Sequence, residues 1–516
     1  MMKLFFILCP SLFISIVLNA QLPEDALRMS YIHPSGTARE QAIGGAMGSL
    51  GGDISATYVN PAGLGFYKTS EYLLSPGWTF DASKTGYLST NTSGPSVNHF
   101  TLATSGVVFG WSTDQDKSSA LSIAVNRTAD FNGHIVYQGK NGYSSAAESY
   151  AEEFQNSGLT LDQALVEPGI SYPTRMALYT YLIDTSQGGS GPVVVQPANV
   201  LAAGGLLGQS TDITTSGGIT EFAIGLASSN HDKWYLGASI GIPVVNYQRT
   251  MRYSETDLSG NTNNNFASYT YTESYSSKGV GVNARLGAIY RPSLNWRVGL
   301  AVHTPSFYSL TDQVSSGMVA NTEGYAGTNS IESATLDQAA NVGNSLDYNL
   351  QTPWQILASG SYIFPGDVTG GKMGFITTDI EYDAIRGSRF SQPTTDAYGN
   401  PVNSGYYDPL NNTVKSYYKN TFNFRLGGEY KVNDLAYRLG GSYSMNPSAS
   451  PDLKANRVTI GGGLGYRKKG IFIDLTYVET ILNDVNFPYR LATKDNVYAT
   501  VRDYTGNLIL TFGVKF

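Results

Sequence analysis

Five arginines stand in glycine-rich segments in which every second residue is apolar: Arg285, Arg297, Arg425, Arg438 and Arg457. A guanidinium binds carboxylates well, because its planar fork donates two parallel hydrogen bonds. These arginines could therefore hold a ligand carboxylate, or they could form ion pairs within the chain. We favour ion pairs, because a buried charge without a partner is costly. The acidic candidates for these pairs are Asp379, Glu381, Glu429 and Asp474.

Residues that perform catalysis or bind metals show no comparable pattern. The segment Gly279–Ala284 fits a loose dinucleotide fingerprint, but it lies within an alternating segment and opens no helix. The histidines have no metal-ligand spacing: His33, His99, His134, His231 and His303. Barrel-shaped lipases and proteases are an alternative, but no Ser–His or Asp–His set can be named. We expect no enzymatic activity, no cofactor and no metal.

The composition is that of neither a typical soluble domain nor a helical membrane protein. Charged residues make up 14% of the 516 residues, against about 25% in typical soluble domains. Gly and Tyr are abundant, with 57 and 36 residues. After the N-terminus, no stretch approaches the roughly 18 apolar residues of a membrane helix. The net charge of −7, without a basic block, argues against a nucleic-acid partner.

The first 20 residues predict a secretory signal peptide. Lys3 is followed by a largely apolar run, Leu4–Leu18, and then by Asn19 and Ala20, which is the order of a basic start, an apolar stretch and a small exit residue. A membrane anchor is the alternative, but a run of about 15 apolar residues is short for one. We expect cleavage after Ala20, which also removes Cys9, the one cysteine.

Alternation of apolar residues with polar or small ones recurs along the rest of the chain. Leu508, Leu510, Phe512, Val514 and Phe516, for example, occupy alternate positions at the C-terminus. Successive side chains of a strand point to opposite faces, so each such segment predicts a strand with one apolar face. We count about fourteen, near 70–82, 97–112, 118–137, 217–229, 234–254, 267–291, 295–305, 351–364, 373–386, 419–431, 434–446, 457–467, 470–480 and 498–516.

The connections between these segments fall into two classes. Tight turns such as 113–116 and 432–433 contrast with long links, at about 139–216, 255–266, 306–350 and 387–418. Short turns at one end, long loops at the other and an even strand number are typical of outer-membrane barrels. The sequence therefore predicts an all-β, transmembrane antiparallel barrel over residues 70–516, in the outer membrane of a Gram-negative bacterium. The terminal aromatic residue is typical of the signal that barrel-assembly machinery reads, and a soluble sandwich is the alternative fold.

Residues 21–69 do not alternate and are too rich in glycine to form a core by themselves. Gly44-Gly45 and Gly51-Gly52 permit tight backbone paths. Pro61 fixes φ and removes a hydrogen-bond donor. A compact, irregular segment ahead of a barrel predicts a plug that folds back into the lumen, where its backbone groups pair with inward polar residues.

Two runs in this segment, Ala38–Ala46 and Ala56–Leu64, resemble the hatch of the FadL/TodX family. These are outer-membrane transporters of long-chain fatty acids and other hydrophobic compounds. The second run contains Asn60, Pro61 and Ala62, which match the family's hatch motif. Later segments resemble the family's central hairpin and late strands: Gly281–Leu300, Phe424–Tyr430 and Gly463–Arg467.

The resemblance implies a fourteen-stranded barrel whose lumen is closed by a hatch. A hydrophobic ligand would bind outside, pass to an internal pocket and leave sideways into the bilayer after the hatch rearranges. A kink in the third strand would open that exit, and the candidate residues are Asn126, Arg127, Asp130 and Gly133. The alternative is that they form only the loop-proximal end of the strand. The expected partners are a hydrophobic small molecule and outer-membrane lipid, with the barrel as a monomer.

Two other functions are compatible with these patterns. One is a barrel component of a protein secretion or assembly system, which would use its loops to bind a partner. The other is a general diffusion porin, against which a filled lumen argues. Fatty acids, aromatic hydrocarbons and tetrapyrroles would all suit an apolar pocket with one or two cations, so the patterns name no ligand.

Overall fold

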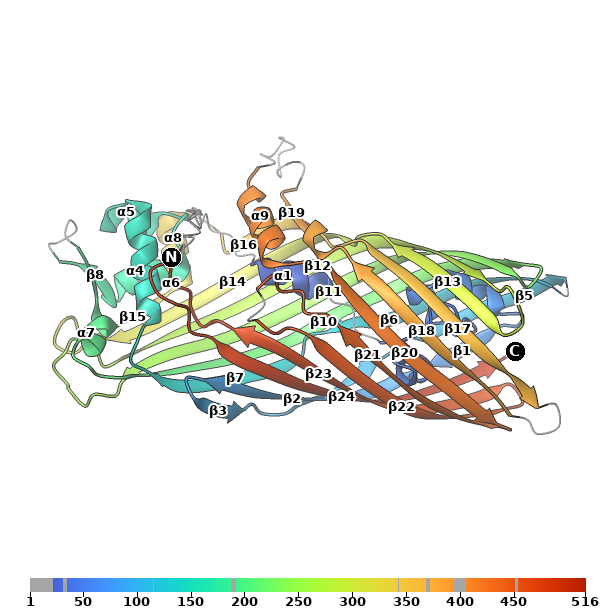
Figure 1. Ribbon diagram of the computed structural model, residues 1–516. Helices are drawn as coiled ribbons and strands as arrows, with labels where there is room; N and C mark the ends of the chain where they lie inside the picture. The colour runs from blue at the N-terminus through green and yellow to red at the C-terminus, as the bar shows by residue number, and fades with distance from the viewer. Residues whose placement is uncertain are drawn as a thin grey trace, which may run out of the picture.

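The computed structural model describes residues 22–30, 35–114, 116–186, 192–341, 343–367, 372–393, 395, 405–450 and 453–516. They form a closed antiparallel β-barrel with helices at one end and a folded segment inside it (Figure 1). Among these residues, no helix has the length and apolar character needed to cross a membrane. The predicted signal peptide, residues 1–20, lies outside the described residues.

Fourteen strand positions close the barrel, as predicted, and several of them consist of two shorter strands. The first three positions are β1 (Glu71–Leu74) with β2 (Pro76–Tyr87), β4 (Val97–Leu102) with β5 (Ser105–Asp114), and β6 (Lys117–Asp130) with β7 (Gly133–Asn141). The next three are β10 (Leu207–Asn230), β11 (Trp234–Asp257) and β12 (Ser268–Tyr290). Three further pairs follow: β13 (Trp296–His303) with β14 (Phe307–Asn321), β16 (Ser345–Gln351) with β17 (Gln355–Asp367), and β18 (Lys372–Asp383) with β19 (Arg389–Ser391). The last five are β20 (Thr421–Val432), β21 (Leu435–Ser444), β22 (Arg457–Lys468), β23 (Ile471–Asn486) and β24 (Ala499–Lys515).

The barrel closes where its first and last strands meet. Both β1 and β2 pair with β24, with Glu71 opposite Lys515 and Gly77 opposite Ile509. Beyond the paired strands, the backbone N–H groups of Ser70 and Phe516 donate to each other's carbonyl oxygens at 3.2 and 3.0 Å. Both ends of the barrel sequence therefore lie at the end with the short turns, as an even strand number requires.

The two faces of the wall differ in the way that the alternation predicts. Outward side chains such as Leu426, Leu439 and Ile460 are apolar and exposed, whereas inward ones such as Asp379 and Thr459 are polar and buried. Outward aromatic rings meet near the short turns: Trp234 lies 4.4 Å from Tyr290, and Trp296 lies 4.9 Å from Tyr362, between ring centroids. An apolar band with aromatic residues at its edge is the surface that a bilayer requires.

Two of the predicted long loops are shorter than the sequence suggested. Residues 207–216 belong to β10, while most of 307–321 and 345–350 pair in β14 and β16, so the loops are 142–206 and 322–344. The link predicted at 387–418 likewise contains β19 and the helix α9 (Asp408–Tyr417). The apolar alternation fails in these strand extensions because their outward side chains are polar, as at Asp212 and Thr214.

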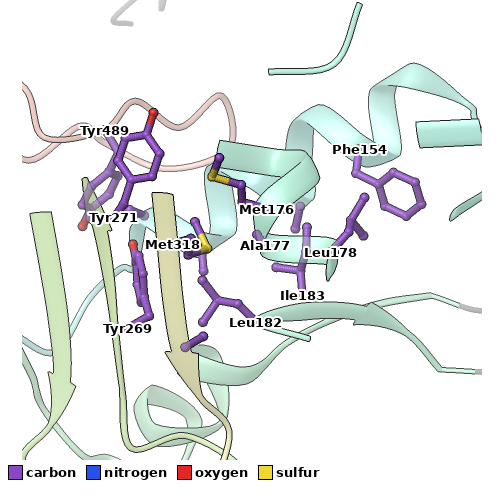
Figure 2. Packing of buried hydrophobic residues seen from close by; sticks show 14 of the residues in the cluster. Phe154, Met176, Ala177, Leu178, Leu182, Ile183, Tyr269, Tyr271, Met318 and Tyr489 are labelled. Carbon is purple, nitrogen blue, oxygen red and sulfur yellow. The ribbon is translucent and has the colours of Figure 1, made fainter. Parts of the chain in front are cut away.

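Helices in the long loops form a cap on the loop end of the barrel. They are α4 (Ala146–Ser157), α5 (Leu161–Val166), α6 (Tyr172–Tyr179), α7 (Gln196–Ala202) and α8 (Ser333–Ala340). Small strands accompany them: β8 (Ile183–Thr185), β9 (Val193–Val195), β15 (Thr328–Glu332) and, next to β2, β3 (Thr90–Ser93). Phe154, Met176 and Leu182 of the cap are buried together with Tyr269 of β12 and Met318 of β14 (Figure 2). The cap is therefore packed onto the wall through a shared apolar core.

Residues 22–30 and 35–69, here called the plug, lie inside the barrel. The plug contains α1 (Pro23–Ser30), α2 (Ala38–Ala42), α3 (Ala56–Val59) and the 3₁₀ helix η1 (Pro61–Phe66). Its backbone groups bond to inward side chains on different sides of the wall. The Ala38 N–H donates to Thr511 Oγ1 at 2.8 Å, and the Gly48 N–H donates to Asp379 Oδ2 at 3.0 Å. The irregular backbone is thus satisfied by the wall, as a buried backbone must be.

Inward glycines allow the plug to approach the wall closely. A Cβ atom on Gly440 of β21 would lie 2.2 Å from the carbonyl carbon of Ile43, and one on Gly237 of β11 would lie 2.4 Å from that of Pro61. No side chain fits at such distances, and glycine in a strand often marks a close approach of another backbone. Much of the glycine in the strands therefore serves the fit of the plug.

We predict that Gly440→Val loosens the plug and leaves the barrel closed, because its Cβ would overlap backbone atoms of Ile43 rather than a flexible side chain. A cysteine at the buried position 46, introduced as Ala46→Cys, reports on this opening through its reaction with maleimide. Labelling should become about tenfold faster, because the free energy of local opening falls by about 1.4 kcal/mol. Gly360→Val is the matched control, since a Cβ there meets nothing within 4 Å. Equal labelling rates in the two variants would contradict this account of the glycines.

Candidate functional site

Asn60 connects two parts of the plug to each other and to the wall. Its side-chain amide donates to the Gly48 carbonyl at 2.6 Å, and its Oδ1 accepts from the Ala62 N–H at 3.1 Å. The second bond caps η1, and Pro61 occupies the first position of that helix, where a missing N–H costs nothing. A longer bond, 3.4 Å, joins the amide to the Ala288 carbonyl of β12. The three predicted hatch-motif residues therefore act as one local unit.

The third barrel strand is interrupted and parts from the second. β6 ends at Asp130 and β7 begins at Gly133, and the pairing with β10 shifts register between Ile219 and Thr220. On the other side, β6 pairs with β5 as far as Val125. Over the described residues, no backbone ladder joins β4 to β6 or β7. The wall thus has a break in its hydrogen bonding between the second and third strand positions, towards the loop end.

Side chains span this break. His99 Nε2 on β4 lies 2.7 Å from Asp130 Oδ2 on β6, and the Ser83 hydroxyl on β2 donates to the His134 carbonyl of β7 at 2.6 Å. Asp130 also accepts from the Asn132 N–H at 3.0 Å, which turns the chain between β6 and β7. The break is therefore closed by a few polar side chains instead of a continuous ladder.

The other two residues proposed for the strand kink point in different directions. The Arg127 guanidinium donates to the Gly217 carbonyl of β10 at 2.5 Å, and its Nε lies 3.9 Å from Asp130. The Asn126 amide instead donates to the Ser35 hydroxyl of the plug at 3.0 Å. Arg127 and Asp130 meet at the break, whereas Asn126 joins the strand to the plug.

A cavity of about 360 Å³ lies in the lumen beside the plug and reaches the break. Its lining mixes apolar side chains, such as Phe131, Ile213 and Leu482, with polar and charged ones. The sequence suggested an apolar pocket with one or two cations. This cavity also contains carboxylates that the sequence did not place there, including Asp81 and Asp503.

The first helix of the plug covers part of this cavity. Ala26 and Met29 of α1 are buried among the rings of inward tyrosines that include Tyr247. Glu24, on the same helix, forms an ion pair of 3.2 Å with Arg490 of the link between β23 and β24. Helix α1 lies beneath α9 and β19 (Figure 1). It is therefore held by the wall on one side and by loop residues on the other.

Arg285 forms a buried ion pair that the sequence did not suggest. Its Nη1 and Nη2 lie 2.6 and 3.0 Å from the two carboxylate oxygens of Glu221, and the two side chains are 4% and 2% exposed. Glu221 is on β10 and Arg285 on β12, with β11 between them. Glu221 reaches across at Gly241, where a Cβ atom would lie 1.8 Å from its Oε1. An inward glycine beside two opposite charges is the signal that could have revealed this pair.

Two other predicted lumen arginines have the acidic partners that the sequence suggested. Arg425 lies 2.7 Å from Glu381, and Arg438 lies 2.5 Å from Asp474 and 2.6 Å from Glu429. These pairs are buried, so each charge is balanced where water does not reach it. The pairs Arg425–Glu381 and Arg438–Glu429 join neighbouring strands, and Arg438–Asp474 crosses from β21 to β23 over β22.

The remaining two arginines differ from each other. Arg297 donates to the carbonyl of Leu50 in the plug, and its guanidinium lies 4.3 Å from the ring centre of Phe66. Arg457 is part of the cavity lining. Asp379, which we expected to pair with an arginine, accepts instead from the plug backbone. The interior charges therefore hold the plug as well as the wall.

The plug also contains a buried carboxyl group. Glu40 is 4% exposed, and burial, together with the nearby Asp53 carboxylate, raises the pKa of Glu40 to about 8. Glu40 is therefore mostly protonated at neutral pH and needs no cation beside it. Within the described ranges, no group of three or more His, Cys, Asp or Glu residues is placed to hold a metal ion.

No protein-family model matches the chain, and no curated protein matches it. Solved structures do match it. A FadL homologue from Pseudomonas aeruginosa is 14% identical over 94% of this chain and 99% of that one, with a TM-score of 0.50. The toluene transporters TodX of P. putida and TbuX of Ralstonia pickettii have 14% and 13% identity, the same coverages, and TM-scores of 0.49 and 0.46.

The first of these matches shows the fold. The chain is a closed, fourteen-stranded antiparallel barrel. More particularly, it has the fold of the FadL/TodX proteins, which the resemblance of its N-terminal segment implied.

We predict that Arg285→Met lowers the free energy of unfolding by about 3–5 kcal/mol, because it leaves the Glu221 carboxylate buried without a partner. The double variant Arg285→Met with Glu221→Leu should recover most of this loss. Urea unfolding in lipid vesicles measures both. Lys468→Met is the control: its side chain is 57% exposed and 3.9 Å from Asp434, so its effect should stay below about 1 kcal/mol. Equal losses in the single and double variants would show that the pair is not the cause.

Proposed function

We propose that the protein is an outer-membrane transporter for the passive uptake of hydrophobic small molecules, with a lateral exit into the bilayer. The observation that carries this proposal is the internal cavity that reaches a break in the wall between β4 and β6–β7. On this proposal the mature chain is exported, is inserted by the barrel-assembly machinery, and works as a monomer in contact with outer-membrane lipid. Long-chain fatty acids are one ligand class that the fold suggests.

A lateral exit is the physically favourable route for an apolar ligand. Each CH₂ group that stays out of water contributes about 0.8 kcal/mol, so a path from the cavity to the acyl chains avoids a large transfer cost. The break offers such a path, because β4 has a free edge that polar side chains cover. In a bilayer, backbone groups without a ladder are tolerated where they line a cavity. This supports the exit at His99 and Asp130.

The plug would have to shift for a ligand to enter and leave the cavity. Asn60 supports this role, because it joins the Gly48 and Ala62 segments of the plug to the wall through hydrogen bonds of one side chain. A rearrangement that breaks these few bonds leaves the ladders of the barrel intact. The hatch function of Asn60, Pro61 and Ala62 therefore rests on a small, separable set of contacts.

We predict that Asn60→Ala combined with Pro61→Ala impairs uptake and leaves a folded, surface-exposed barrel. The change removes a helix cap, worth about 1 kcal/mol, and should lower the rate of uptake of a radiolabelled hydrophobic ligand by cells about fivefold. Asn433→Ala, in the turn between β20 and β21, is a matched control outside the plug. Normal transport by the double variant would remove the support for the hatch assignment.

We also predict that closing the break stops transport. In the variant His99→Cys with Asp130→Cys, oxidation should cross-link β4 to β6 and bring uptake to background, and a reductant should restore it. The control is Ser119→Cys with Ser228→Cys, whose hydroxyls lie 3.2 Å apart on the intact β6–β10 ladder. If the first cross-link forms and uptake continues, the ligand does not leave through this break.

A further inference from the structure

A row of polar side chains crosses four adjacent strands on the wall of the cavity. Cross-strand pairing places Asp81 of β2 opposite Thr505 of β24. Thr505 lies opposite Thr480 of β23, which in turn lies opposite Thr459 of β22. All four side chains line the cavity. Directly opposed residues have Cβ atoms about 4.5–5.5 Å apart, so the row presents one carboxylate and three hydroxyls at regular intervals.

Hydrogen bonds within the row leave part of its capacity unused. The Thr505 hydroxyl donates to Asp81 Oδ2 at 2.9 Å, and the hydroxyls of Thr459 and Thr480 lie 3.1 Å apart. A hydroxyl has one donor and two acceptor lone pairs, so one hydrogen of the threonine pair remains for a further partner. On β24, two residues before Thr505, the buried Asp503 Oδ1 accepts no hydrogen bond from the described residues. The row and its surroundings therefore offer both donors and acceptors.

The charged groups of the lining do not select a charged ligand. The lining carries four arginines and four aspartates, so neither sign is in excess. Some of these arginines already have carboxylate partners: Arg28 pairs with Asp25, and Arg249 lies 2.5 Å from Glu273. A ligand with a net charge would lose its hydration without meeting an excess of the opposite charge. A neutral group of hydroxyls loses less hydration and can form hydrogen bonds with the row.

Apolar side chains lie next to the row and on other strands around the cavity. Val478 and Leu482 stand two residues before and two after Thr480 on β23, and both line the cavity. The rings of Phe131 and Tyr247 meet edge to face at 5.3 Å between centroids. A sugar ring has hydroxyls around its edge and apolar C–H groups on its faces. The combination of a hydroxyl row with apolar neighbours suits such a ring.

We infer that the cavity takes a neutral amphiphile whose head group carries several adjacent hydroxyls, such as an alkyl glycoside. The head-group hydroxyls would donate to Asp81 and Asp503 and accept a hydrogen bond from the threonines of the row. The alkyl chain would lie along Ile135 and Ile213, which line the cavity on the strands beside the break. The inference rests on the proposed uptake of hydrophobic molecules and names the head group that the cavity selects.

Equilibrium dialysis of the purified mature protein tests this, with the protein transferred to amphipol so that no detergent micelles compete. The radiolabelled probes share a ten-carbon chain and are used below their critical micelle concentrations: decyl glucoside, decanol, decanoate and decylamine. Decyl glucoside should bind about tenfold more tightly than decanol, the effect of one or two neutral hydrogen bonds. Decanoate and decylamine should bind no more tightly than decanol.

The variant Thr459→Val with Thr480→Val removes both hydroxyls of one pair. Neither partner is left orphaned, so the barrel should still fold. The variant should weaken the binding of decyl glucoside about tenfold and leave that of decanol within about twofold. The control is Ser210→Ala with Ser254→Ala, another cross-strand hydroxyl pair, 2.8 Å apart on β10 and β11 and outside the cavity lining. Heat-modifiable migration verifies that each variant is folded.

The outcomes separate this inference from the transport proposal. If the parent protein binds decyl glucoside no more tightly than the other three probes, the head-group assignment is overturned and hydrophobic uptake stands, whether or not a variant folds. An equal loss of decyl glucoside and decanol in the folded threonine variant has the same meaning. Failure of all four probes to bind the parent protein overturns both. A preference for decyl glucoside that disappears in the threonine variant and persists in the serine variant supports the assignment.

Discussion

The structure depends above all on one requirement: every buried backbone N–H and C=O group needs a partner. A closed antiparallel sheet meets this requirement with its own ladders, and the pairing of β1 and β2 with β24 completes it. Wherever a ladder is missing, side chains must take its place. This is why the break beside β4 is occupied by His99, Asp130 and Ser83, and why the irregular plug lies among inward hydroxyl and carboxylate groups.

The same requirement explains how a polar interior accommodates a plug. The wall supplies hydrogen-bonding side chains, and its inward glycines let two backbones meet at distances that a Cβ atom would forbid. Buried arginines then balance the carboxylates that remain. The ion pair between Arg285 and Glu221 combines a buried arginine with an inward glycine. Because Gly241 has no side chain, the Glu221 carboxylate can cross β11 and reach Arg285 on a strand that is not its neighbour.

The cavity and the break lie next to each other in the structure. Apolar residues of β7, β10 and β11 line the part of the cavity beside the break, and polar and charged residues line the rest together with further apolar ones. A path from this cavity to the bilayer would keep an apolar ligand out of water. Such a path depends on which strands face each other across the lumen and on where their pairing stops.

The sequence by itself determined the barrel and its fourteen strand positions, because alternation and turn length are local properties. The composition of residues 21–69 also predicted a segment that stands apart from the strands of the wall. The sequence also named Glu381, Glu429 and Asp474 among the carboxylates that would pair with inward arginines, but not which arginine each of them would meet. It failed where outward residues become polar, so that parts of β10, β14 and β16 were taken for loops. Only the tertiary structure decided that Glu221 pairs with Arg285, that Asp379 serves the plug, and that Asp81 and Asp503 share one cavity. Those contacts depend on register and on closure of the barrel, which join residues that no local pattern relates.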